Sequence, residues 1–305
     1  WNPLPSPSSV NGMALYENVN YSITPGFRPV QLDIYKTPGA ANQPCLIWIH
    51  GGGYAGGTRI EGTPWFEATN YRQKALELGF AIASIDYRMP PDGTYPTSVA
   101  DVHYAIRWLK SKATSLGSRP ELVGAMGSSA GGHLTMLAAM KPEDSRYAAI
   151  QLPGGERFDA RVPFIVSQWP ALCPLDSYHE RVEYEGAHGA PKFGGKIFWE
   201  NYWITESAMA EGSPVLALER GDKLELPRVM YIKNASEPIE ARHTTPQALL
   251  DRFVNAYRKA GGHVEVLLFE GPDYDNIRTH PETPSSQATF AKMIEFIHRE
   301  AKTRV

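Results

Sequence analysis

Two short glycine-rich segments carry the residue types that acyl-transfer chemistry needs. The first is GSSAG, residues 127–131, which has the form G-x-S-x-G with Ser129 at its centre and lies between a strand-like and a helix-like run. Small residues at both ends permit a sharp turn that exposes the seryl oxygen, and the amides at the start of the following helix point toward it. Ser129 is therefore the predicted nucleophile.

The second segment is HGGGY, residues 50–54, which follows directly from the apolar run PCLIWIH. Consecutive glycines leave backbone N–H groups unobstructed, so these groups can donate to the oxyanion of a tetrahedral intermediate. We expect Gly52 and Gly53 to be two donors and the N–H of Ala130 to be the third. His50, at the entrance of this loop, is interpreted as a residue that orders the loop.

The elements around these motifs alternate along the chain. Residues 16–36 show two alternating runs typical of a hairpin. The predicted strands after it cover residues 44–50, 80–87, 121–127, 162–169, 228–233 and 264–270. The predicted helices cover residues 64–79 (roughly), 96–117, 129–140, 246–261 and 285–302. This order predicts one mostly parallel sheet that is flanked by helices on both faces.

The two motifs, in this order and on these elements, resemble the α/β-hydrolase fold and, within it, the hormone-sensitive-lipase-like carboxylesterases. The resemblance runs from about residue 28 to the C-terminus and rests on HGGGY, SIDYRM (84–89), YPTSVADVHYAIRWL (95–109) and GSSAGGHL (127–134). It implies a single domain over residues 1–305 and structural ion-pair roles for Asp101 and Arg107. It also implies a core position for His133. A separate N-terminal cap is not expected, because the region before the first strand is short.

A seryl nucleophile needs a histidine as general base and a carboxylate that orients it. In this sequence the residues at both of these positions depart from the family pattern. In this fold the acid and then the histidine follow the nucleophile along the chain. The pattern for the acid falls on NASEPIEARH, where Glu237 stands at the usual aspartate position and Glu240 is the alternative. The histidine position, read from Gly271 in GPDY, holds Tyr274. A phenol with a pKa near 10 is a poor general base at neutral pH.

Three explanations for the missing histidine stay open. His280 could serve as the base from a longer loop, because extra loop residues cost little closure entropy. His243 could reach the site from the acid loop, or the site could lack a base. We therefore expect a serine hydrolase that cleaves a small carboxylic ester. The alternative is a ligand binder, lyase, isomerase or cyclase that uses the oxyanion hole, with Tyr274 as a hydrogen-bond donor. The sequence does not separate ester from amide substrates.

Residues 170–212, called the aromatic insertion below, interrupt the alternation. The insertion is rich in Tyr, Phe and Trp and shows no clean period. We interpret it as a lid over a pocket, with a surface excursion around its own small core as the equal alternative. The residues predicted to shape the pocket are Tyr54, Trp169, Trp199, Trp203 and Tyr274, together with Phe198 and Tyr202. For each of these, ordinary core packing is the competing interpretation.

Composition narrows the classes of partner. A net charge of −3 and a pI near 6.3 give no basic surface for nucleic acid. The sequence has no apolar run long enough to span a membrane and no signal-like N-terminus, which favours a cytoplasmic protein. Cys45 and Cys173 do not form a disulfide framework, and no motif predicts a metal or an organic cofactor. The expected partner is a small-molecule ester. The sequence leaves the oligomeric state open, and a homodimer is one of the possible states.

Overall fold

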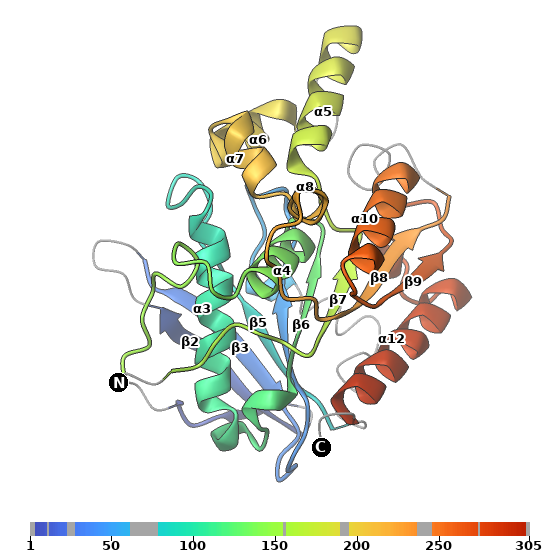
Figure 1. Cartoon of the computed structure of the whole chain (residues 1–305). Helices are drawn as coiled ribbons and strands as arrows, with labels where there is room; N and C mark the ends of the chain where they lie inside the picture. The colour runs from blue at the N-terminus through green and yellow to red at the C-terminus, as the bar shows by residue number, and fades with distance from the viewer. Residues whose placement is uncertain are drawn as a thin grey trace.

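A nine-stranded sheet runs through the molecule in the order β1-β2-β3-β5-β4-β6-β7-β8-β9 (Figure 1). The structure is a computed structural model that describes residues 4–10, 12–22, 28–61, 79–154, 157–189, 195–236, 246–273 and 275–302. The strands are β1 Ser8–Val10, β2 Met13–Ser22, β3 Val30–Lys36, β4 Cys45–Ile49, β5 Ala81–Ile85, β6 Val123–Ser128, β7 Phe164–Gln168, β8 Arg228–Asn234 and β9 Val264–Phe269.

The sheet is antiparallel at its N-terminal edge and parallel elsewhere. β1, β2, β3 and β5 pair antiparallel in turn, whereas β5, β4 and β6 to β9 pair in parallel. Every residue of β4 and β5 is buried, because helices cover both faces of a parallel sheet. This explains why these strands, apart from Ser84, are apolar in the sequence. The predicted hairpin and the mostly parallel sheet are confirmed.

The helices pack on two separate hydrophobic cores. The helical elements are η1 Arg59–Glu61, α3 Thr97–Lys112, η2 Thr114–Leu116, η3 Pro120–Leu122, α4 Ala130–Met140, α5 Pro174–His188, α6 Gly195–Trp203, α7 Glu206–Glu211, α8 Pro214–Arg220, α10 Gln247–Lys259, α11 Asn276–Thr279 and α12 Pro284–Lys302. Ile47 and Ile49 of β4 pack in the core that α3, α4 and α10 cover. Leu46 and Trp48 of the same strand pack in the core that α12 covers. Most of the helix predicted over 64–79 falls on residues 62–78, which lie outside the described residues.

The aromatic insertion is helical, although its sequence shows no clean period. α5, α6 and α7 pack on one another and lie together at the top of the view in Figure 1. α5 begins six residues after the end of β7, so the insertion leaves the sheet at the carboxyl end of a central strand. Trp199, Tyr202 and Trp203 of α6 are buried, whereas Ile197 and Phe198 are exposed. Because both the buried and the exposed sides of this short helix carry apolar side chains, its sequence shows no clear helical period.

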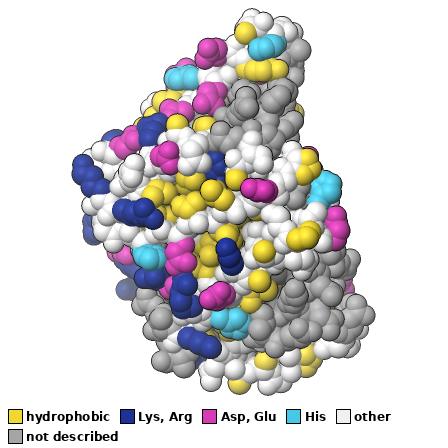
Figure 2. Space-filling model, turned by 90° about the vertical axis from the view of Figure 1, so that its right-hand side faces the viewer, with side chains coloured by type: hydrophobic (Ala, Val, Ile, Leu, Met, Phe, Trp, Pro, Cys, Tyr) yellow, Lys and Arg dark blue, Asp and Glu magenta, His cyan; other side chains and the backbone are white. Residues whose placement is uncertain are grey.

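β9 forms the other edge of the sheet. Figure 2 faces the β9 side of the molecule, where hydrophobic side chains are visible between charged ones. Val266 and Leu268 on β9 are 38% and 49% exposed. The charged neighbour Glu265 forms an ion pair with Arg299 and a hydrogen bond with His263 at this edge. Charged side chains on an edge strand oppose its pairing with other chains.

A buried ion pair fixes the start of α3. Asp101 accepts hydrogen bonds from Nε and Nη2 of Arg88 at 2.9 and 2.6 Å and from the Arg88 backbone N–H at 2.9 Å. The prediction that Asp101 is an ion-pair residue is confirmed. The same prediction for Arg107 is wrong. Its guanidinium donates to His103 Nδ1 and to the Ile150 carbonyl, and it has no carboxylate partner within the described ranges.

We expect Asp101→Ala to destabilise the protein by about 3–5 kcal/mol, because it removes the buried carboxylate to which the largely covered Arg88 guanidinium donates. Asp92→Ala is the matched control, since the Arg28–Asp92 pair is exposed (89% and 38% for the two side chains). An exposed pair contributes less than about 1 kcal/mol. Urea unfolding of the two variants measures the difference. Equal losses of stability would contradict the role assigned to Asp101.

Candidate active site

Ser129 occupies a strained turn between β6 and α4. Its backbone angles are φ 52° and ψ −118°, a region that non-glycine residues rarely adopt. Three hydrogen bonds hold the turn: the Ser129 N–H donates to the Gln168 carbonyl at 2.9 Å, and the Ser129 carbonyl accepts from the N–H groups of His133 at 3.1 Å and Ala171 at 3.4 Å. Such strain, about 1–3 kcal/mol, concentrates at functional sites. The sharp turn expected from G-x-S-x-G is present.

The helix after Ser129 packs directly on the end of β4. A Cβ atom added at Gly131 would lie 2.2 Å from the carbonyl oxygens of both Ile49 and His50. Backbone atoms cannot rotate away, so only glycine permits this approach. The first turn of α4, which begins with the buried Ala130, therefore touches the strand end from which the HGGGY loop starts.

The glycine loop and the serine turn lie side by side. A Cβ atom at Gly51 would lie 3.2 Å from Ser129 Cβ. Gly52 and Gly53 follow with φ values of 111° and 62°, and the Gly52 carbonyl accepts from the N–H groups of Ala55 and Gly56 at 3.1 Å. The predicted donors Gly52 and Gly53 are thus on the loop after β4, and Ala130 begins α4. This loop and this helix are in contact at the carboxyl ends of β4 and β6.

His50 is held as a scaffold residue. Its ring stacks on Tyr87 with centroids 4.3 Å apart, and its Nδ1–H donates to the Gly51 carbonyl at 2.7 Å. The Tyr87 hydroxyl in turn donates to the His50 carbonyl at 3.0 Å. Burial lowers the pKa of His50, so the ring is neutral at pH 7. These contacts agree with the interpretation that His50 orders the loop.

His280 lies between α11 and α12 with 42% of its side chain exposed. Its Nδ1 is 3.3 Å from Asp273 Oδ2 and 3.0 Å from Thr279 Oγ1, and the Thr279 hydroxyl donates to the same Asp273 oxygen at 3.1 Å. Within the described ranges no hydrogen bond joins His280 to Ser129. The other candidates for the acid and base positions, Glu237, Glu240, His243 and Tyr274, lie outside the described residues.

The Asp273–His280 contact was not anticipated from the sequence. Asp273 belongs to the GPDY segment, in which only the tyrosine was singled out. α11 folds the chain back between the two residues, and a short helix of four residues is difficult to recognise from sequence. The only sign of this contact in the sequence is a carboxylate that stands seven positions before a histidine in one loop.

The aromatic residues predicted to shape a pocket are mostly buried against one another. Tyr54 stacks on Tyr202 with centroids 4.4 Å apart and contacts Trp199 and Trp203 edge-on at 5.5 and 5.6 Å. None of these four side chains is more than 3% exposed. Trp169 is in the other core, 5.9 Å from Phe269. This placement is the one that the core-packing interpretation predicts.

A hydrogen bond of His133 links α4, the helix after Ser129, to the end of the aromatic insertion. Its Nε2 lies 2.7 Å from the Gly212 carbonyl, which can only accept, so Nε2 carries the proton. Nδ1 is buried without a hydrogen-bond partner among the described residues. Burial therefore lowers the pKa of His133 to about 4. The core position implied by the family resemblance fits this environment.

This buried histidine makes stability depend on pH. The unfolded chain binds a proton at the ordinary pKa of 6.5, whereas the folded protein does so only near 4, so stability falls as the pH decreases between these values. At pH 5 the linkage costs about 2 kcal/mol relative to pH 7. We expect His133→Asn to lose less stability than the wild type over this interval, measured by urea unfolding. Parallel curves would contradict the prediction.

Cofactor and membrane features are absent from the part of the chain that the structure describes. No group of three or more His, Cys, Asp or Glu side chains could hold a metal ion there. None of the helices in that part combines the length and the apolar character that crossing a membrane requires. Both cysteines are free and buried, and burial raises the thiol pKa of Cys45 to about 12 and of Cys173 to about 11.

The chain is similar to proteins named as esterases and lipases. The family model described as BD-FAE matches residues 32–169, which include both glycine-rich motifs. The probable carboxylic ester hydrolase LipM of Mycobacterium tuberculosis is 35% identical over 138 residues, 44% of this chain and 30% of LipM. Lipase 2 of Moraxella sp. is 35% identical over 203 residues, 61% of this chain and 45% of that enzyme. The chain spans about a third of the length of the first curated relatives.

Solved structures share the whole architecture. Esterase B of Lactobacillus rhamnosis has a TM-score of 0.74 and 20% identity, with 97% of this chain and 90% of that chain covered. Butyrate-bound esterase Est2 of Thermogutta terrifontis has a TM-score of 0.69 and 20% identity, with 95% and 94% covered. The strand order, the serine turn after β6 and the glycine loop after β4 occur here on that shared fold.

Proposed function

We propose that this chain, which has the α/β-hydrolase fold and is similar to the hormone-sensitive-lipase-like carboxylesterases, is a serine esterase that cleaves small carboxylic esters. The observation that carries the proposal is the contact between two loops. Ser129 sits on a strained turn, and that turn touches the HGGGY loop at Gly51 and at the end of β4. A nucleophile beside unobstructed backbone amides is what acyl transfer requires.

We infer a two-step acyl-transfer reaction. Ser129 Oγ attacks the ester carbonyl, and the N–H groups of Gly52, Gly53 and Ala130 stabilise the oxyanion that forms. His280 accepts the seryl proton and returns it to the leaving alcohol, which leaves an acyl group on Ser129. Water, deprotonated by the same imidazole, then attacks the acyl carbonyl and releases the carboxylic acid and free Ser129.

The acid that orients His280 has two candidates. The family pattern favours Glu237, whereas the contact of Nδ1 with the carboxylate favours Asp273. A carboxylate at Nδ1 fixes the tautomer in which Nε2 is free to take the seryl proton. We expect Asp273→Asn to lower kcat by about 10²–10⁴-fold, with Glu237→Gln as the comparison. A large loss in Glu237→Gln and none in Asp273→Asn would assign the acid to Glu237.

We also propose that the aromatic insertion covers the substrate. It leaves the sheet after β7, and the serine turn is hydrogen-bonded to the last residue of that strand, Gln168. The insertion therefore starts beside the reacting groups, where a lid would exclude water. Trp199 and Trp203 of α6 would form the apolar base of this lid.

The test is hydrolysis of p-nitrophenyl acetate, propionate, butyrate and octanoate at neutral pH, together with labelling by a fluorophosphonate probe. Short acyl groups are chosen because the similar structures include propionate- and butyrate-bound esterases and a tributyrin-phosphonate complex. We expect turnover of the short esters and one label on Ser129. His280→Ala should remove most of the rate. A wild-type protein that neither hydrolyses nor labels would contradict the proposal and favour a non-hydrolytic pocket.

A further inference from the structure

The last residue of the HGGGY loop is anchored outside the sheet. Tyr54 has a φ of 63° and no exposed surface. Its ring stacks on Tyr202 at an interplanar angle of 6° and meets Trp199 and Trp203 edge-on. All three of these residues belong to α6. A further edge-on contact, at 5.6 Å, joins Tyr54 to His133 on the helix that follows Ser129.

The glycines of this loop have no side chains with which to hold their own conformation. In the loop the first anchored side chain is His50, which stacks on Tyr87. The second is Tyr54, which packs on α6. Gly52 and Gly53, the proposed oxyanion donors, lie between one anchor on the sheet side and one anchor on the insertion. The glycine segment is therefore anchored at both of its ends.

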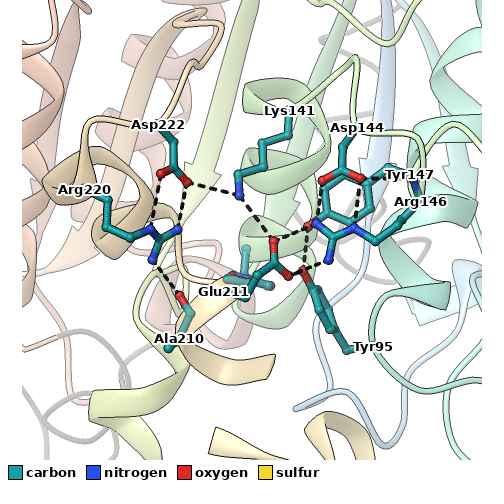
Figure 3. A network of polar contacts seen from close by, with 11 residues as sticks. Tyr95, Lys141, Asp144, Arg146, Tyr147, Ala210, Glu211, Arg220 and Asp222 are labelled. Atoms are coloured by element: carbon teal, nitrogen blue, oxygen red, sulfur yellow. Dashed lines mark hydrogen bonds and ion pairs between the residues drawn. The ribbon is translucent and has the colours of Figure 1, made fainter. Parts of the chain in front are cut away.

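α6 and α7 are fixed to the rest of the protein from the opposite side. The Tyr95 N–H donates to the Tyr202 carbonyl at 3.0 Å, and the Tyr95 ring lies 4.7 Å from Trp203. Figure 3 shows the network that Tyr95 shares with Glu211 at the end of α7. The Glu211 carboxylate also accepts from Arg146 Nη2 at 2.7 Å and pairs with Lys141 at 3.4 Å. The insertion thus has a defined position relative to α4.

We propose that Tyr54 is a positioning residue, through which α6 of the aromatic insertion sets the orientation of the Gly52 and Gly53 amides. The inference rests on the proposed function. It concerns the ring and not the hydroxyl, because the buried Tyr54 hydroxyl has no hydrogen-bond partner among the described residues. Phenylalanine can therefore replace Tyr54, whereas an aliphatic residue cannot reproduce the stack on Tyr202.

The test compares Tyr54→Phe, Tyr54→Leu and Trp203→Leu for hydrolysis of p-nitrophenyl butyrate. We expect Tyr54→Phe to stay within about twofold of the wild type. Tyr54→Leu and Trp203→Leu should lower kcat by about 10–10³-fold with KM changed less than about threefold, because misplaced donors weaken binding of the transition state more than of the substrate. The effect of Trp203→Leu is decisive, since this residue lies on the insertion.

Phe164→Leu is the matched control. Phe164 is fully buried at the start of β7 in the other core, against Phe296. The Phe164→Leu variant should lose about as much thermal stability as Tyr54→Leu and Trp203→Leu, and it should keep the wild-type kcat. If Tyr54→Leu and Trp203→Leu lose no more kcat than Phe164→Leu, or raise KM alone, the inference is overturned.

Hydrogen exchange of the amides of residues 50–57 separates this inference from the proposed function. Faster exchange in Trp203→Leu than in Phe164→Leu would support the coupling between α6 and the loop even in a protein without esterase activity. Equal exchange in these two variants would overturn the coupling, whatever the activity. An inactive wild type with coupled exchange would contradict the esterase proposal alone.

Discussion

Ser129→Ala is expected to lower kcat/KM for short esters by at least about 10⁴-fold and to abolish labelling by a fluorophosphonate. The substitution removes the atom that forms the acyl bond, while the amides of Gly52, Gly53 and Ala130 remain. Oxyanion donors and substrate binding alone leave a residual acceleration over water of about 10³–10⁴-fold. Steady-state kinetics and mass spectrometry of the labelled protein measure both effects.

Ser128→Ala is the matched control for this prediction. Ser128 is the adjacent hydroxyl, buried at the end of β6, and it has ordinary strand geometry. The Ser128→Ala variant should keep its esterase activity within about tenfold of the wild type, and the fluorophosphonate should label it as it labels the wild type. Ser129→Ala keeps a Cβ at the same φ of 52°, so its stability should match the wild type within about 0.5 kcal/mol. Persistent hydrolysis by folded Ser129→Ala would show that another group is the nucleophile.

The central sheet could be predicted because burial on both faces leaves a direct mark on sequence. β4 and β5 are fully buried, and apart from Ser84 their residues form short apolar runs. Ser129 could be predicted for a similar reason, since the turn between a strand and a helix needs small residues at fixed positions. β1 could not be predicted, because three residues carry no periodic signal.

The partner of Asp101 shows where sequence spacing is insufficient. Asp101 and Arg107 both lie on α3, and both are buried charged residues. Arg88 lies before the helix and reaches Asp101 only because the chain turns back between residues 89 and 96. Arg107 projects toward the Ile150 carbonyl instead. A charge can be recognised from sequence, whereas its partner depends on how the loop closes.

The aromatic residues illustrate a second limit. Tyr and Trp suit both a binding pocket and a core, so residue type does not separate the two. Tyr54 follows directly from the glycine loop, which suggested contact with substrate. From its contacts with α6 and α4 we infer how a loop of glycines obtains a fixed shape. The role of this residue follows from its neighbours, which come from a segment far along the chain.

Gly131→Ala is expected to have the second largest effect, with about 3 kcal/mol less stability and about 10²–10³-fold lower kcat/KM. An added methyl group would lie 2.2 Å from two backbone oxygens, those of Ile49 and His50. The contact can be relieved only if α4 moves away from the end of β4. Because Ala130 is on α4 and Gly52 and Gly53 follow β4, this movement would separate the oxyanion donors.

Gly186→Ala is the control, because this glycine in α5 has nothing within 4 Å of an added Cβ. Alanine there should raise stability by about 0.5–1 kcal/mol through its higher helix propensity. Urea unfolding and ester kinetics of the two variants, compared with the wild type, test the argument. If Gly131→Ala kept wild-type stability and activity, α4 would not pack on β4 as closely as the structure shows. The serine turn and the glycine loop would then be independent, and the geometric basis for an oxyanion hole shared between them would be lost.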